Sequence, residues 1–207
     1  MFIAGQSVRL RPVIPDDYPV LSRWCFTHKT FHYLARRMEA RLFSESGSGL
    51  ETILAGSMVL MIVDRAYNPM GYAVLFDVNP RDRHMHLDVF TMPQCPATVR
   101  MEAWLLLLDH VLAWFPVEKV YRQLPEFASS EYPIAMSMGF EEEGFLRDVL
   151  WFGDRFWGIH TLALSRERWS QSRGVFIDDL TIQARYESLA GQSSESEPGK
   201  RIDDTTT

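Results

Sequence analysis

The sequence predicts one α/β domain in which a central mixed, mostly antiparallel sheet is flanked by helices. The first observation is a series of three β-rich runs, at residues 57–63, 71–78 and 84–91, which tight turns separate as in an antiparallel meander. The second is a leucine-rich stretch over residues 99–115, which is apolar on more than one helical face and predicts a well-buried helix. The 207 residues are enough for one domain with a substantial core.

The segment before the meander predicts a strand followed by helices. Residues 8–12 alternate between apolar and basic side chains, which is typical of a short strand. The Pro-Asp-Asp sequence at residues 15–17 predicts a helix start, because proline fits the first turn and acidic side chains favour the helix N-terminus. We expect this helix over residues 18–29. Further helical segments are expected at residues 31–41 and 51–55, on either side of a serine- and glycine-rich break.

The segment after the leucine-rich helix predicts a strand, a short helix and a hairpin. The strand is expected over residues 118–127. The short helix is expected from a Ser-Ser-Glu cap at residues 129–131 to Gly139, because serine caps helix starts and glycine ends helices. Two β-rich runs, at residues 145–152 and 156–164, flank a Gly-Asp turn and predict a hairpin.

The C-terminal part changes in character after residue 169. We therefore assign residues 1–169 to the main domain. Residues 170–190 keep some apolar content and are expected to form a docking segment, as a helix or a strand. Residues 191–207 are polar and contain a proline, and we expect them to form a disordered tail.

The composition bears on partners and compartment. The formal net charge of −6 disfavours nucleic acid, whose phosphates a negative surface repels. The N-terminal sequence has arginines where a signal peptide needs an apolar stretch, and the longest apolar run, residues 104–108, is far shorter than the roughly 20 residues of a membrane-spanning helix. Two isolated cysteines, Cys25 and Cys95, give no disulfide framework. We expect a soluble cytoplasmic protein without nucleic-acid or membrane partners.

Five phrases, spread in order over residues 8–169, resemble the GNAT superfamily of acyl-CoA N-acyltransferases. In particular they resemble the branch of the ribosomal-protein alanine acetyltransferases. The phrases are VRLRPVIPDDYPVLSRW, LDVF, MEAWLLLLDHVLAWF, MGFEEEGFLRD and DRFWGIHTLALSRERW. The resemblance implies a GNAT-like fold, acetyl-CoA or another acyl-CoA as co-substrate, no metal, and the primary amine of a small molecule or peptide as acceptor. The resemblance is also compatible with a homodimer.

In that family the amides at the start of the long helix bind the pyrophosphate of acyl-CoA, because helix N-termini attract anions. A glycine-rich loop normally allows the close approach, but here residues 94–101 read QCPATVRM and contain no glycine. The loop is therefore degenerate. Arg100 can replace lost amides by its charge, and Thr98 can cap the helix or contact a phosphate. A helix start that binds no ligand is the alternative.

By resemblance, the CoA-binding residues fall on the third meander strand, the following loop and the helix start. The strand residues offer backbone groups to the pantetheine arm. The expected set is Val89, Phe90, Thr91, Met92, Gln94, Ala97, Thr98, Val99 and Arg100.

The family's tyrosine, which protonates the departing thiolate, aligns with Ala135, and its asparagine aligns with Ala128. Tyr132 lies three residues before Ala135 and hence on the same helical face, so it is a candidate for a displaced acid. A packing role is the alternative for Tyr132.

Acyl transfer to an amine also needs a base. His86 and Asp88 share one face of the third meander strand, and Glu126 near the end of the next strand is a third candidate. Alternatively, His86 and Asp88 pair with each other or with Arg81 or Arg83.

The sequence His84-Met85-His86-Leu87-Asp88 also places three potential zinc ligands on one strand face. In metallo-β-lactamase-like hydrolases another histidine follows, but here that position is Val89. Later histidines and aspartates do not complete a two-metal site, so we expect no metal.

Two classes of function remain from the sequence, an enzyme and a protein without catalysis. One is an N-acyltransferase, most simply an N-acetyltransferase, that acts on the amine of a protein or small molecule. The other is a catalytically degenerate GNAT-fold protein used for binding or regulation, which the glycine-free loop and the missing tyrosine favour. An altered acyl donor would also fit an unusual loop.

Overall fold

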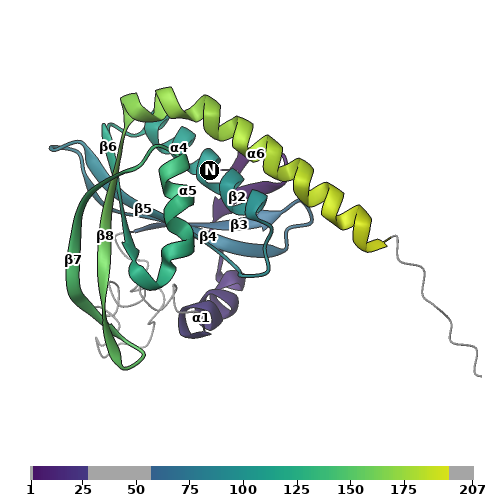
Figure 1. Cartoon of the computed structure of the whole chain (residues 1–207), viewed down its shortest axis with the longest axis horizontal. Coiled ribbons are helices and arrows are strands. Elements are labelled where there is room, and N and C mark those ends of the chain that lie inside the picture. Colours follow the sequence, from purple (N-terminus) through teal and green to yellow (C-terminus); the bar gives the residue numbers. More distant parts are fainter. Residues whose placement is uncertain (1, 28–56, 196–207) are drawn as a thin grey trace, which may run out of the picture.

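The computed structural model describes residues 2–27 and 57–195. Within these residues one eight-stranded sheet has the order β1-β2-β3-β4-β5-β6-β8-β7 (Figure 1). The β5–β6 pair is parallel and the other neighbouring pairs are antiparallel. The predicted mixed, mostly antiparallel sheet with flanking helices is confirmed.

The first part of the chain forms the meander side of this sheet. Its elements are β1 (Ile3–Ala4), β2 (Val8–Pro12), η1 (Pro15–Asp17), α1 (Tyr18–Thr27), β3 (Met58–Asp64), β4 (Pro69–Asn79) and β5 (His84–Thr91). The strands expected at residues 8–12, 57–63, 71–78 and 84–91 are found within about two residues of their predicted ends. The helices expected at residues 31–41 and 51–55 lie outside the described residues.

The second part completes the sheet and supplies most of the helices. Its elements are α4 (Ala97–Trp114), β6 (Lys119–Pro125), η2 (Glu126–Glu131), α5 (Tyr132–Ser137), β7 (Glu141–Phe152), β8 (Arg155–Ser165) and α6 (Arg166–Glu195). The predicted short helix is α5, which ends at Ser137, two residues before Gly139, whose φ of 93° is left-handed, as glycine permits. The Ser-Ser-Glu sequence expected to cap this helix instead lies in η2, and α5 has no side-chain cap hydrogen bond. The hairpin turn has positive φ at both Gly153 and Asp154, the geometry of a type I′ turn.

The two faces of the sheet carry separate cores. Met85, Leu87 and Val89 of β5 belong to the larger core, which also includes residues of α4, α5 and α6. Phe90 points to the opposite face and packs in a second cluster with Leu21 and Trp24 of α1. The alternation predicted for β5 is therefore confirmed. As the sequence predicts, α4 is well buried, and Trp104 and Leu107 in it are fully covered.

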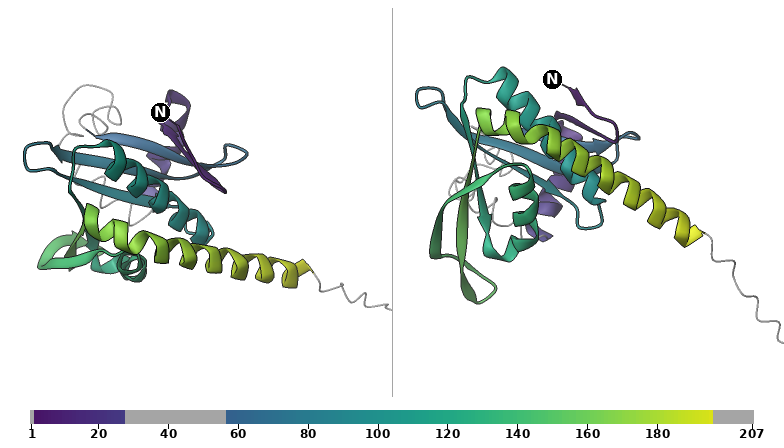
Figure 2. Two further views of the ribbon diagram at one scale, coloured as in Figure 1. Left: turned by 90° about the horizontal axis from the view of Figure 1, so that it is seen from above. Right: turned by 45° about the horizontal axis from the view of Figure 1, so that its top comes forward.

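The C-terminal helix α6 begins within the segment assigned to the main domain and continues through the predicted docking segment. Trp169 and Phe176 anchor it in the larger core, and Arg173 pairs with Asp109 of α4 at 2.7 Å. The helix passes across α4, and its C-terminal end extends beyond the other described elements (Figure 1; Figure 2). Residues 196–207 lie outside the described residues. No helix in residues 2–27 or 57–195 is long and apolar enough to cross a membrane.

Candidate functional site

The sheet opens between its two parallel strands. β5 and β6 pair at three positions, His84 with Lys119, Met85 with Val120 and His86 with Tyr121. Both strands continue past these pairs, but each then pairs only with its outer neighbour, β5 with β4 and β6 with β8. We call the unpaired inner edges, residues 87–91 of β5 and 122–125 of β6, the fork. Backbone groups on such edges need partners other than the sheet ladder.

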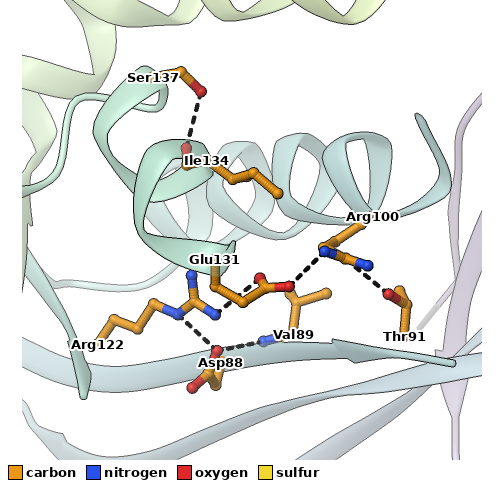
Figure 3. Close-up of polar contacts among 8 residues, drawn as sticks. All are labelled: Asp88, Val89, Thr91, Arg100, Arg122, Glu131, Ile134 and Ser137. Atoms are coloured by element: carbon orange, nitrogen blue, oxygen red, sulfur yellow. Dashed lines mark hydrogen bonds and ion pairs between the residues drawn. The ribbon is translucent and has the colours of Figure 1, made fainter. Parts of the chain in front are cut away.

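A chain of alternating charges crosses the fork (Figure 3). The guanidinium of Arg122 on β6 donates from Nε to Asp88 Oδ1 on β5 at 2.9 Å and from Nη2 to Glu131 Oε2 at 3.2 Å. Glu131, at the end of η2, also accepts from Arg100 Nη1 of α4 at 2.5 Å. Arg100 in turn donates from Nε to Thr91 Oγ1 at 2.9 Å. These hydrogen bonds and ion pairs connect β5, β6, η2 and α4.

The central pair of this chain is buried. Arg122 is 1% exposed and Asp88 is 6% exposed. Burial raises the pKa of Asp88 to about 6 from its ordinary 3.8, although the charge of Arg122 opposes the shift. The guanidinium carbon of Arg122 lies 4.8 Å from the ring centroid of Trp104, and Arg122 Nη1 has no hydrogen-bond partner.

One oxygen of Asp88 collects two donors. Asp88 Oδ1 accepts from the backbone N–H of Val89 at 2.9 Å as well as from Arg122 Nε at 2.9 Å. Figure 3 shows both donors directed at the same oxygen, on the inner edge of β5. A backbone amide and a cation at these distances are the arrangement that stabilises a negatively charged oxygen.

The start of α4 has an unusual cap. Pro96 is the N-cap and supplies no side-chain hydrogen bond. Instead Glu187 of α6 accepts from Thr98 Oγ1 at 2.5 Å and from the Thr98 backbone N–H at 3.4 Å. Burial opposes ionisation of Glu187, but hydrogen bonds from Thr98 and Gln183 hold its pKa below the usual range. The helix end predicted to bind phosphate therefore carries an internal carboxylate.

The other predicted CoA-binding residues lie as follows. Val89 and Val99 are buried in the larger core, and Phe90 packs with Tyr72 on the opposite face. Gln94 is exposed. Met92 donates its backbone N–H to Met70 of β4, and Ala97 is the first residue of α4.

His86 does not pair with Asp88. Its ring stacks against Phe76 at 5.3 Å and Tyr121 at 5.4 Å, on the α1 side of the sheet, and its Nδ1 lies 3.9 Å from Asp77. His84 meets Tyr121 edge-on. No group of three or more potential metal ligands gathers anywhere in the described part of the chain.

Glu126 and Tyr132 contact the outer strands. The Glu126 carboxylate accepts the backbone N–H of Gly158 on β8. The Tyr132 hydroxyl donates to Glu142 of β7 at 2.7 Å, and this hydrogen bond raises the pKa of Tyr132. β8 and β7 lie beyond β6 in the sheet, so neither contact places these groups with Asp88 in the fork.

Of the four predicted catalytic residues, the structure places Asp88 in the charge chain of the fork, together with the predicted Thr91 and Arg100. Arg122, Glu131 and Glu187 were not predicted. Arg122 did have a signal, because it stands between Val120 and Leu124 at an inward position of β6 where the alternation calls for an apolar residue. No local sequence pattern marks Glu131 or Glu187 as site residues.

Comparison with known proteins identifies the architecture. No protein-family model matches the sequence, and no curated protein matches it. The spermidine N-acetyltransferase from Vibrio cholerae in complex with CoA and spermine matches with a TM-score of 0.63 and 16% identity, over 78% of this chain and 97% of that one. A GCN5-related N-acetyltransferase from Brucella melitensis matches with a TM-score of 0.65 and 15% identity, over 87% of this chain and 85% of that one.

The chain has the GNAT fold. At these identities the likeness concerns the fold, and it confirms the GNAT-like architecture predicted from the sequence. The narrower resemblance to the ribosomal-protein alanine acetyltransferases stays a prediction.

Proposed function

We propose that the protein is a CoA-dependent N-acyltransferase that transfers an acyl group, most simply acetyl, to a primary amine of a small molecule or peptide. The observation that carries the proposal is the fork of a GNAT fold with a titratable carboxylate, Asp88, at its inner edge. The similar Vibrio cholerae enzyme was solved with CoA and spermine, which supports an acyl-CoA donor and a small-molecule amine acceptor. The ribosomal-protein branch would instead favour a protein N-terminus.

The donor would lie along the inner edge of β5. In this proposal the backbone of residues 89–92 contacts the pantetheine arm, and the first turn of α4 with Arg100 receives the phosphates. Glu187 must then leave Thr98, because a carboxylate and a pyrophosphate repel each other at one helix end. Gln94, Ala97 and Val99 border that helix end and complete the proposed donor site.

Asp88 is the base that the contacts support best. A carboxyl with a pKa of about 6 is ionised at neutral pH and is a stronger base than an ordinary aspartate. It takes one proton from the ammonium form of the acceptor. The neutral amine then attacks the thioester carbonyl, the C–N bond forms, the C–S bond breaks, and the second nitrogen proton goes to the CoA thiolate.

His86 on the α1 side remains an alternative base, since it lies on the same strand. Glu126 and Tyr132 remain predictions as base and acid. Their hydrogen bonds to Gly158 and Glu142 would have to break before either group acted on a substrate in the fork.

A binding or regulatory protein without catalysis is the second candidate. The charge chain through Arg122 and Glu131 runs across the fork, and Glu187 sits on the helix end that would bind phosphate. Through both contacts, groups of the protein itself occupy the positions where an enzyme of this family would bind its acyl donor. They therefore favour a protein that keeps the fold without the reaction.

A thermal-shift titration with acetyl-CoA and with CoA separates the two candidates. A ligand that binds the folded state raises the melting temperature by mass action, by an amount that grows with ligand concentration. Arg100→Ala should reduce the shift, and Arg173→Ala, which breaks the ion pair of α6 with Asp109 of α4 and removes no residue of the fork, serves as the matched control. Absence of any shift at millimolar acetyl-CoA would reject the enzyme.

A further inference from the structure

Arg122 is a buried charge that the proposed chemistry does not yet use. It occupies an inward position of β6 between Val120 and Leu124, and it is 1% exposed. A buried guanidinium is costly unless all its donors are paired, and an apolar residue at such a site is often as stable or more stable. Arg122 Nη1 nevertheless has no acceptor. Stability of the sheet alone therefore does not account for an arginine here.

The position of Arg122 suggests what it can bind. It lies where β5 and β6 stop pairing, and its Nε converges with the Val89 amide on Asp88 Oδ1, both at 2.9 Å. Donors between about 2.7 and 3.1 Å from one oxygen are the geometry of an oxyanion-binding site. A carboxylate oxygen is the closest analogue among protein groups of the negatively charged oxygen that forms when an amine attacks a thioester.

We propose that Arg122 is a carbonyl-binding residue, whose guanidinium and the Val89 amide together hold the thioester oxygen of the acyl donor. The inference rests on the proposed function and adds a residue to it. In the structure Asp88 Oδ1 accepts from both donors. When the donor binds, its carbonyl oxygen takes that position, and the displaced Asp88 carboxylate is free to accept the proton of the amine.

The charge is then accounted for at each step. Attack of the neutral amine moves the carbonyl electron pair onto oxygen, where Arg122 and the Val89 amide stabilise it. This electron pair then re-forms the carbonyl double bond as the C–S bond breaks. The electrons of the C–S bond leave with the CoA sulfur. Arg122 gives up no proton, since a guanidinium stays protonated in proteins.

Two substitutions separate carbonyl binding from a structural role. Arg122→Met removes the charge with similar volume, and Asp88 can then become neutral while Glu131 keeps Arg100. Arg122→Lys keeps the charge but loses the planar set of donors. Arg83→Met is the matched control, because Arg83 forms an exposed ion pair with Glu118 at 2.6 Å, in the turns that precede β5 and β6.

The test is the infrared carbonyl band of acetyl-CoA labelled with ¹³C at the acetyl carbonyl, bound to the protein without an acceptor amine. The wild type and Arg83→Met should shift the band to lower frequency than free acetyl-CoA, and Arg122→Met should return it toward the free value. The preference for acetyl-CoA over CoA, measured by calorimetry, should fall in Arg122→Met and Arg122→Lys. Turnover with an amine that the wild type acetylates should drop roughly 100-fold, as for loss of one oxyanion donor.

Three other outcomes would contradict a carbonyl-binding role for Arg122. An unchanged band and an unchanged acetyl-CoA preference in both Arg122 variants would leave Arg122 as a structural residue while the enzyme stands. Equal loss of CoA and acetyl-CoA binding in both variants would also show that Arg122 has a structural role and does not bind the carbonyl oxygen. A wild type that binds neither ligand would remove the proposed function, and the carbonyl-binding role with it.

Discussion

Arg122 and Asp88 join the two parallel strands at the point where the strands stop pairing, with Nε and Oδ1 2.9 Å apart (Figure 3). Elsewhere in the sheet neighbouring strands are held by backbone ladders. Here a buried ion pair replaces the ladder. Because the pKa of Asp88 is raised to about 6 in this buried pair, its protonation should contribute to the pH dependence of stability.

Asp88→Asn should flatten the pH dependence of stability between about pH 4 and pH 6. The pKa of Asp88 is raised from 3.8 to about 6, so the folded chain binds this proton more tightly than the unfolded chain. The group therefore favours folding most below pH 3.8, and this contribution is lost as the pH rises through about 6, on the order of 3 kcal/mol in total. Urea unfolding at several pH values measures it.

The matched control for this experiment is Asp16→Asn, at an exposed position of η1. It should leave the slope of the wild type unchanged. A variant Asp88→Asn with the same slope as the wild type would show that Asp88 titrates in the folded protein as it does in the unfolded chain.

The pH dependence of activity should have the opposite sign to the pH dependence of stability. A base must be deprotonated, so the rate should rise with pH through about pH 6, the pKa of Asp88, and level off above it. Asp88→Asn should lower the rate about 10²–10⁴-fold and remove the rise. A pH–rate profile that is identical in the variant would assign the base to another group, with His86 the next to test by His86→Gln.

Glu187→Gln should tighten binding of CoA. The Glu187 carboxylate accepts from Thr98 at the start of α4, and its removal frees that helix end for the phosphates. We expect a gain of roughly two- to fivefold in affinity by calorimetry, together with a loss of about 1 kcal/mol of stability from the missing cap. Glu167→Gln, at an exposed position of the same helix, is the control. Equal affinities in the two variants would mean that phosphate binds elsewhere.

Gly158→Ala should destabilise the hairpin. A Cβ at Gly158 would lie 2.2 Å from the Phe145 ring, and it would also meet the Glu126 carboxylate at 3.0 Å. Overpacking of this kind costs about 1–3 kcal/mol. Gly144→Ala, on the partner strand with nothing within 4 Å of its Cβ, is the matched control and should be nearly neutral. Thermal unfolding of the two variants under one condition compares them directly.

Local patterns in the sequence predicted much of the fold. Period-two alternation located β5 and assigned its faces, and the Gly153-Asp154 turn located the hairpin, because both signals lie within a few residues. The boundary placed after residue 169 was based on a change in composition, and the structure shows one helix running through it. The helices expected at residues 31–41 and 51–55 lie outside the described residues.

The candidate site was less predictable, since its contacts join distant parts of the chain. Asp88 was found because it lies on a strand face with His86. Its partner Arg122 is 34 residues away, and the contact of Thr98 with Glu187 spans 89 residues. No local pattern encodes such pairings. The one usable signal was a charged residue at an inward position of β6, and it becomes informative only when the neighbouring strand is known.

A crystal structure of the protein with CoA would show whether the fork holds the acyl donor. We expect the pantetheine arm in the fork, between residues 89–92, at the end of β5 and just after it, and residues 122–125 of β6, with Glu187 displaced from Thr98 and the phosphates at the first turn of α4. CoA bound at another surface, with the contacts of Arg122 to Asp88 and of Glu187 to Thr98 intact, would contradict it.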